Sequence, residues 1–160
     1  MKRINRLVTM LLLIFSVSAS AEGLFRDMSG NFQTFQQSLS KDKWTVVMIW
    51  AHDCHICNQE AEQYAFLDEN DNIQVLGISI DGWVNRDAAE TFISQHDLEF
   101  PNLITDYPGI QQFYRSAAKG NFVGTPTIMV YNPAGNLMAA QAGAVPAQTI
   151  QKFIADKSPD

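Results

Sequence analysis

The sequence contains two cysteines, Cys54 and Cys57, within its 160 residues. A disulfide that closes so short a loop restrains the unfolded chain very little, so stability is a poor reason for it. Structural disulfide frameworks in exported proteins usually need more cysteines, spread along the chain. The pair is therefore interpreted as a site for thiol–disulfide exchange.

The sequence around the pair predicts how its two sulfurs differ. Trp44 to Trp50 is a nearly unbroken apolar run, typical of a strand buried on both faces, and a helix is expected from Cys54 to Leu67. Free N–H groups and the helix dipole favour negative charge at a helix start, so they stabilise a Cys54 thiolate. Cys57 lies one turn further in, where better shielding suits the resolving thiol.

Strands and helices alternate along the rest of the chain. This order predicts an α/β domain with a mixed central sheet flanked by helices on both faces and an antiparallel hairpin at one edge. The other predicted helices are Asn31–Ser40, Asn85–His96, Ile110–Ala118 and Pro146–Ala155, and the other predicted strands are Ile73–Ile80, Asn102–Thr105, Thr127–Tyr131 and Leu137–Ala142.

Three segments resemble one known group of proteins. WAHDCHIC, directly after WTVVMI, resembles the active-site segment of the thioredoxin superfamily, and the chain as a whole resembles its exported TlpA/ResA-type thiol–disulfide oxidoreductases. Ser79 to Asp106 is similar to the extra β-α unit of that type, and Val123 to Leu137 is similar to its cis-proline loop and hairpin. The resemblance extends from about Leu24 to Ile154 and implies a thioredoxin fold.

The resemblance also implies roles for particular residues. It implies a cis peptide bond between Thr125 and Pro126, with the backbone of Thr125 pairing with a bound substrate peptide. Glu60 matches an acid that these proteins carry near the active site. We expect protein thiols or disulfides as substrates, a membrane or periplasmic redox partner, a monomer, and no cofactor or resident metal.

The sequence departs from the family pattern at four places. Asp53 stands where Trp is common before the first cysteine, and His55-Ile56 replaces a pair that often contains Pro. Met48 stands where thioredoxin has a buried acid, and Thr127 where haem-maturation relatives have an acidic residue. No buried base can therefore come from position 48.

Charged neighbours act on Cys54 in opposite directions. When protonated, His52 and His55 favour its thiolate, whereas Asp53 and Glu60 oppose it. His52, His55 and Glu60 are accordingly predicted to tune the redox potential. Asp53 has an equally good interpretation as an ordinary helix N-cap, and Glu60 as a solvated helix residue.

The N-terminal residues predict export. Lys2, Arg3 and Arg6 precede an apolar stretch and the small residues Ala19-Ser20-Ala21, so residues 1–21 are expected to be a cleaved signal peptide and residues 22–160 one thioredoxin-like domain in the periplasm. The remaining chain has eight basic and 17 acidic residues, a formal charge of −9. This acidic balance argues against binding to nucleic acid.

Three functions remain open at this stage. The favoured one is a periplasmic oxidoreductase, closer to a reductase because the chain lacks the helical insertion and dimerisation domain of dedicated oxidases and isomerases. A disulfide-donating oxidase is the first alternative. The second is a module that binds Cu(I) or another metal, because His52, His55 and the two cysteines are all potential ligands. A non-catalytic scaffold is disfavoured by the cysteine pair and the proline together.

Overall fold

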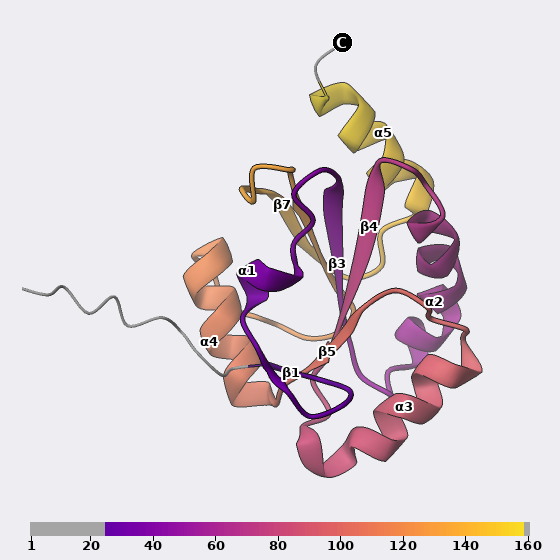
Figure 1. The fold of residues 1–160 in the computed structure, drawn as a ribbon, viewed down its shortest axis with the longest axis vertical. Coiled ribbons are helices and arrows are strands. Elements are labelled where there is room, and N and C mark those ends of the chain that lie inside the picture. Colours follow the sequence, from indigo (N-terminus) through magenta and orange to yellow (C-terminus); the bar gives the residue numbers. More distant parts are fainter. Residues whose placement is uncertain (1–24, 159–160) are drawn as a thin grey trace, which may run out of the picture.

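The computed structural model describes residues 25–158, so the predicted signal peptide lies outside the described residues. A seven-stranded sheet forms the centre, with the strand order β2-β1-β5-β4-β3-β6-β7 (Figure 1). The strands are β1 Phe25–Asp27, β2 Phe32–Gln33, β3 Trp44–Trp50, β4 Ile73–Ser79, β5 Asn102–Ile104, β6 Thr127–Tyr131 and β7 Leu137–Ala142. The helices are α1 Phe35–Ser38, α2 His55–Asp68, the short 3-10 helix η1 Trp83–Asn85, α3 Arg86–Gln95, α4 Tyr107–Ala118 and α5 Ala147–Lys157.

The sheet is mixed, as predicted. β3 pairs in parallel with β4 and β4 with β5, whereas β6 lies antiparallel to β3 and continues into the β6–β7 hairpin. The inserted unit η1–α3–β5 corresponds to the extra β-α unit expected between Ser79 and Asp106.

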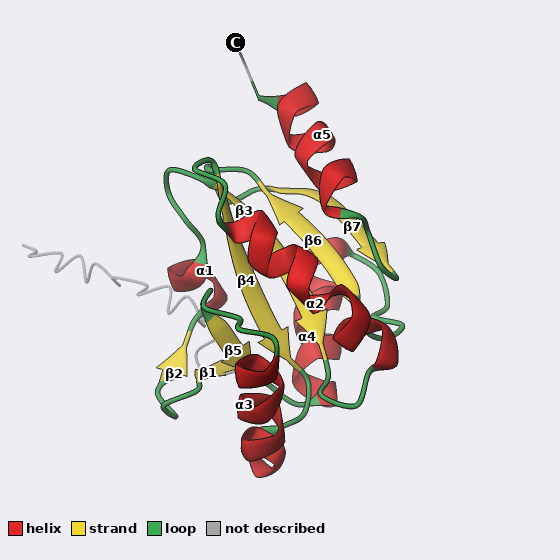
Figure 2. Cartoon of the chain, turned by 90° about the vertical axis from the view of Figure 1, so that its right-hand side faces the viewer, coloured by secondary structure: helices red, strands yellow, loops and turns green. Residues whose placement is uncertain are grey.

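Helices cover both faces of the sheet, and this explains why β3 is buried along its whole length. Helices α2, α3 and α5 lie on one face, and α1 and α4 on the other (Figures 1 and 2). Side chains of β3 alternate between the two layers, with Met48 and Trp50 in the first core and Val47 and Ile49 in the second. A strand covered on both faces needs side chains that tolerate burial, and Trp44 to Trp50 provides them: six are apolar, and the hydroxyl of buried Thr45 accepts the Ser40 N–H at 3.1 Å.

The predicted helix Asn31–Ser40 is wrong in most of its length. The segment instead forms the short strand β2, paired with β1, and the four-residue helix α1. Phe32 is 64% exposed and lies 4.5 Å from the Arg26 guanidinium, whereas Phe35 is buried, so the two phenylalanines do not share one helical face. The chain turns between the strands at Gly30, whose φ of 94° suits glycine.

The other predicted elements exist, and most differ only at their ends. Helix α4 begins at Tyr107, three residues before the predicted start at Ile110. The side chain of Asp106 accepts a hydrogen bond from the Gly109 N–H at 2.8 Å, which caps the helix, and Pro108 occupies its first turn. The capping residue lies outside the apolar pattern from which the helix was predicted, so that pattern placed the start too late.

Candidate active site

The cysteine pair lies where strand β3 ends and helix α2 begins. Cys54 and Cys57 form a disulfide, with their Cα atoms 5.2 Å apart. Cys54 is the N-cap residue of α2, and its Sγ accepts a hydrogen bond from the backbone N–H of Cys57 at 3.1 Å. The predicted placement of the pair at a helix start is therefore present in the structure.

The two sulfurs have different surroundings. The side chain of Cys57, on the inner side of α2, is fully buried in the core, whereas Cys54 is half-buried. In the reduced protein, the Cys57 N–H and the positive end of the helix dipole would stabilise negative charge on the Cys54 sulfur. The arrangement thus offers one accessible sulfur for attack and one shielded sulfur behind it.

A tight turn leads from β3 into the pair. The Cys54 N–H donates to the Ala51 carbonyl at 3.2 Å, which places His52 and Asp53 at the corners of the turn. Because Cys54 itself caps α2, the interpretation of Asp53 as the N-cap is wrong. The Asp53 side chain is exposed. The Cys54 sulfur takes the place of the side-chain oxygen that usually caps a helix, because it accepts the otherwise free N–H of Cys57.

Sequence analysis missed Asp81, which the fold places beside this turn. The Asp81 carboxylate lies 2.6 Å from His52 Nδ1 and accepts the backbone N–H of His52 at 3.1 Å. Parallel pairing sets Trp50 opposite Ser79, and His52 and Asp81 each follow two residues later. The carboxyl ends of neighbouring parallel strands lie at the same edge of a sheet. If β3 and β4 had been predicted to be neighbours, this rule would have placed Asp81 beside His52.

Asn58 and His96 form a second set of contacts that sequence analysis did not assign. The amide nitrogen of Asn58 donates to the carbonyls of His52 and Cys54 at 3.1 and 3.0 Å. Its amide oxygen lies 3.0 Å from Nε2 of His96, at the end of α3. Asn58 therefore ties the cysteine turn to its own helix and to α3, and nothing in the local sequence pattern indicates this contact.

Two of the predicted tuning residues, His55 and Glu60, lie on α2. His55 is exposed at the first helical position, beside the disulfide. Glu60 is half-buried and hydrogen-bonded to Gln63, one turn beyond the pair. Burial raises the pKa of the adjacent Tyr64, and the Glu60 charge raises it further.

The loop before β6 brings Thr125 and Pro126 to the same end of the sheet. The peptide bond between them is cis, Pro126 is buried, and Thr125 is half-buried. Antiparallel pairing sets Thr127 opposite Ile49, so the loop lies beside the end of β3 from which the cysteine turn departs. The Pro126 carbonyl accepts the Gly143 N–H at 2.8 Å, which ties the loop to the end of β7.

The described residues contain one cluster with the geometry to hold a metal ion, made of His52, Asp53 and Asp81. It is not the set of two histidines and two cysteines considered from the sequence. The Asp81 carboxylate in this cluster already accepts hydrogen bonds from Ser79 and His52. We therefore assign no metal to it.

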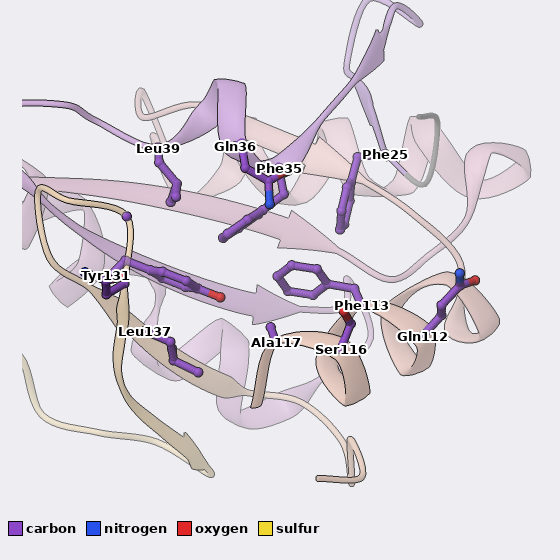
Figure 3. Close-up of a pocket in the computed structure, with 12 residues that line it drawn as sticks. Phe25, Phe35, Gln36, Leu39, Gln112, Phe113, Ser116, Ala117, Tyr131 and Leu137 are labelled. Atoms are coloured by element: carbon purple, nitrogen blue, oxygen red, sulfur yellow. The ribbon is translucent and has the colours of Figure 1, made fainter. Parts of the chain in front are cut away.

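A cavity of about 400 Å³ lies on the opposite face of the sheet, between α1, α4 and the β6–β7 hairpin. Phe35, Phe113, Tyr131 and Leu137 point toward one another there (Figure 3). No residue of the cysteine site lines this cavity. The cavity is thus separate from the redox pair.

Comparison with known protein families agrees with this geometry. A model of the AhpC/TSA family matches residues 19–140, which is most of the chain. The chain belongs to the AhpC/TSA family. This thioredoxin-like membership, together with the disulfide at the start of α2, confirms the predicted superfamily and agrees with the predicted enzyme class, a thioredoxin-like thiol–disulfide oxidoreductase. No curated protein sequence matches the chain.

Solved structures share the fold at low sequence identity. A secreted Mycobacterium tuberculosis disulfide oxidoreductase homologous to E. coli DsbE is 20% identical, with a TM-score of 0.65 over 86% of this chain and 96% of that one. StoA from Bacillus subtilis is 17% identical, with a TM-score of 0.62 over 84% and 97% of the two chains. A thiol:disulfide interchange protein from Chlorobium tepidum is 15% identical, with a TM-score of 0.66 over 84% and 90%. These likenesses confirm the thioredoxin fold.

Within residues 25–158, none of the helices combines the length and the apolar character needed to cross a membrane.

Proposed function

We propose that this family member is an exported thiol–disulfide oxidoreductase that reduces disulfides of protein substrates in the periplasm. The observation that carries the proposal is the asymmetry of the pair: Cys54 is half-buried at the N-cap of α2, with a backbone N–H directed at its sulfur, and Cys57 is fully buried behind it. An attacking thiol must be reachable and partly ionised, whereas a resolving thiol needs only to reach the first sulfur.

The exchange proceeds in two displacements. The Cys54 thiolate attacks one sulfur of the substrate disulfide, forming a mixed disulfide and releasing the other substrate sulfur as a thiolate. Cys57, after losing its proton, then attacks the Cys54 sulfur, which closes the Cys54–Cys57 disulfide and releases the second substrate thiolate. The substrate gains two electrons and the protein loses two. A dithiol donor at the membrane or in the periplasm then reduces the protein again, and the reverse sequence would donate a disulfide.

The surrounding residues support this cycle in distinct ways. We assign substrate binding to the loop at Thr125 and Pro126, because it lies at the same end of the sheet as the cysteine turn. An extended substrate backbone would pair with Thr125, while the exposed side chains of Ile56 and Val123, 42% and 74% accessible, offer apolar contact. His52, His55 and Glu60 are assigned to tuning the potential.

Trapping tests the proposed exchange. Reduced protein carrying Cys57→Ser should form a stable mixed disulfide with insulin, because the serine cannot resolve it. Cys54→Ser is the matched control and should trap nothing, since Cys57 is fully buried. Equal trapping by the two variants, or none by Cys57→Ser, would contradict the proposal.

Export is tested separately from chemistry. We propose that residues 1–21 are removed and that residues 22–160 act as a single monomeric domain. The intact mass of the protein recovered from the periplasm should correspond to a chain that begins at Glu22. A mass that includes residues 1–21 would contradict cleavage, and recovery from the cytoplasm alone would contradict the location.

A further inference from the structure

Asp81 is a buried carboxylate beside the cysteine turn, and it takes no part in the two displacement steps proposed above. Its side chain is 4% exposed. It accepts the Ser79 hydroxyl at 2.6 Å and the His52 backbone N–H at 3.1 Å, and it lies 2.6 Å from His52 Nδ1. A carboxylate so far removed from water is costly to keep ionised unless donors surround it, and here two of its three contacts come from His52.

The contact through Nδ1 determines what the rest of the His52 ring can do. When Nδ1 donates its hydrogen to a carboxylate, the other ring nitrogen, Nε2, is the basic one. A proton taken up at Nε2 makes an imidazolium, which the adjacent carboxylate stabilises through a short charge-assisted hydrogen bond. The His52 side chain is 38% exposed, so Nε2 is not sealed in the core as Asp81 is.

Other titratable groups surround His52 and Asp81, but none of those named below combines a buried carboxylate with a direct contact to the His52 ring. Asp53 lies within 4.8 Å of His52 and Asp81 but is exposed. Asp106 approaches from the start of α4, across Gly82, and is exposed as well. From α2, His55 is exposed, and from α3, His96 is linked to the turn only through Asn58. Asp81 is the buried acid among these groups, and it holds the imidazole directly.

His52 and Cys54 belong to the one tight turn that the Cys54 N–H closes onto the Ala51 carbonyl, and Asn58 holds the carbonyls of both. We propose that the His52–Asp81 pair accepts the proton that the Cys54 thiol gives up, with Asp81 acting as a positioning residue through His52. This inference rests on the proposed function. In the reduced protein the Cys54 S–H proton moves to Nε2 of His52, leaving a thiolate and an imidazolium. The thiolate attacks the substrate disulfide, and the imidazolium returns its proton to the departing substrate thiolate.

The rate at which Cys54 is alkylated measures how far its thiol has given up its proton. In a Cys57→Ser background, Cys54 is the one remaining cysteine, and its rate of reaction with iodoacetamide near pH 6 follows its thiolate fraction. Asp81→Asn removes the charge that holds the imidazolium and should lower this rate about tenfold. Glu62→Gln is the control, because it removes an exposed carboxylate from α2 about two turns beyond Cys54, and its rate should stay within about twofold of the parent.

A double substitution separates positioning through His52 from a general effect on the turn. His52→Asn keeps Ser79 and the position-52 backbone N–H as partners of Asp81, and it should also lower the rate about tenfold. Adding Asp81→Asn to His52→Asn should then change nothing more. If Asp81→Asn lowers the alkylation rate of the His52→Asn protein by a further tenfold, the proposal is overturned. An alkylation rate unchanged by His52→Asn alone would also overturn it, and this single variant gives that test even if Asp81→Asn does not fold.

The potential gives a second measure in the protein with both cysteines. A tenfold loss of thiolate stabilisation should shift the glutathione equilibrium of Asp81→Asn toward the disulfide form by at most about tenfold, which corresponds to a potential at most about 30 mV more negative. These measurements do not depend on insulin trapping. If trapping fails while Asp81→Asn still slows alkylation, the proposed function fails and the proton relay stands; the opposite pattern overturns the relay alone.

Discussion

Two buried tyrosines provide a stability test with opposite expected signs. Tyr64, on α2, is fully buried, and its hydroxyl donates to the Val145 carbonyl at 2.9 Å. Tyr131, at the end of β6, is 4% exposed, and its hydroxyl is buried without a hydrogen-bond partner among the described residues. Figure 3 shows this ring at the cavity formed with α4.

The magnitudes follow from what each hydroxyl contacts. Tyr64→Phe removes one hydrogen bond and leaves the buried side of the Val145 carbonyl without its partner, so the free energy of unfolding should fall by about 2 kcal/mol. Tyr131→Phe removes an unsatisfied polar atom and keeps the aromatic packing, so the free energy of unfolding should rise by about 0–1 kcal/mol. The two variants should therefore differ by about 2–3 kcal/mol although the chemical change is the same.

Urea unfolding at neutral pH, followed by tryptophan fluorescence, measures the difference. It should appear as a change in midpoint with an unchanged slope, because the area exposed on unfolding is nearly constant. Destabilisation of more than about 1 kcal/mol by Tyr131→Phe would contradict an unpaired Tyr131 hydroxyl, since it would require a hydrogen-bond partner that residues 25–158 do not provide.

The same tyrosines predict the response to alkaline pH. Burial raises the pKa of both side chains above the ordinary value near 10. Because each folded pKa exceeds the unfolded one, neither group lowers the free energy of unfolding well below pH 10, and ionisation of the unfolded chain lowers it as the pH rises further. Between about pH 9 and pH 11 either phenylalanine variant should lose less stability than the parent protein. Equal losses in all three proteins would contradict the assigned pKa shifts.

Two more substitutions test the sheet and the cysteine turn. Gly77→Ala would place a methyl group against the Asn102 side chain and 3.0 Å from Trp50 Nε1, so we expect a loss of about 2–3 kcal/mol in urea unfolding; a loss below about 0.5 kcal/mol would contradict the packing. Asn58→Ala removes the amide that holds the His52 and Cys54 carbonyls, and it should cost about 1–2 kcal/mol. Unchanged unfolding would show that the turn holds its position without that amide.

Local patterns in the sequence predicted the elements that carry the cysteines. Trp44 to Trp50 is apolar at every position but Thr45 because helices cover both faces of β3, and this type of strand is recognisable without its neighbours. The β6–β7 hairpin has the predicted bounds, since Pro133 and Gly135 mark its turn. Cys54 and Cys57 were identified for the same reason, because their spacing and the following helix are both local features.

Features that depend on distant partners could not be predicted in this way. Residues 25–33 form a hairpin at the sheet edge because β1 pairs with β5, about 75 residues later in the chain. The second strand of this hairpin falls in the segment Asn31–Ser40, for which the local phenylalanine spacing predicted a helix. The contact between His52 and Asp81 spans 29 residues and that between Asn58 and His96 spans 38. Each needs the order of strands and helices in space, which periodicity within one segment does not contain.

The reduction potential of the Cys54–Cys57 couple, measured by equilibration against glutathione or dithiothreitol buffers, distinguishes a protein disulfide reductase from a disulfide donor. We expect a reversible two-electron couple at about −250 mV or below, as for a periplasmic reductase that is reduced again by a dithiol donor. A potential of about −120 to −150 mV would contradict the reductase direction and indicate a disulfide donor. A pair that does not equilibrate with either buffer would contradict thiol–disulfide exchange itself.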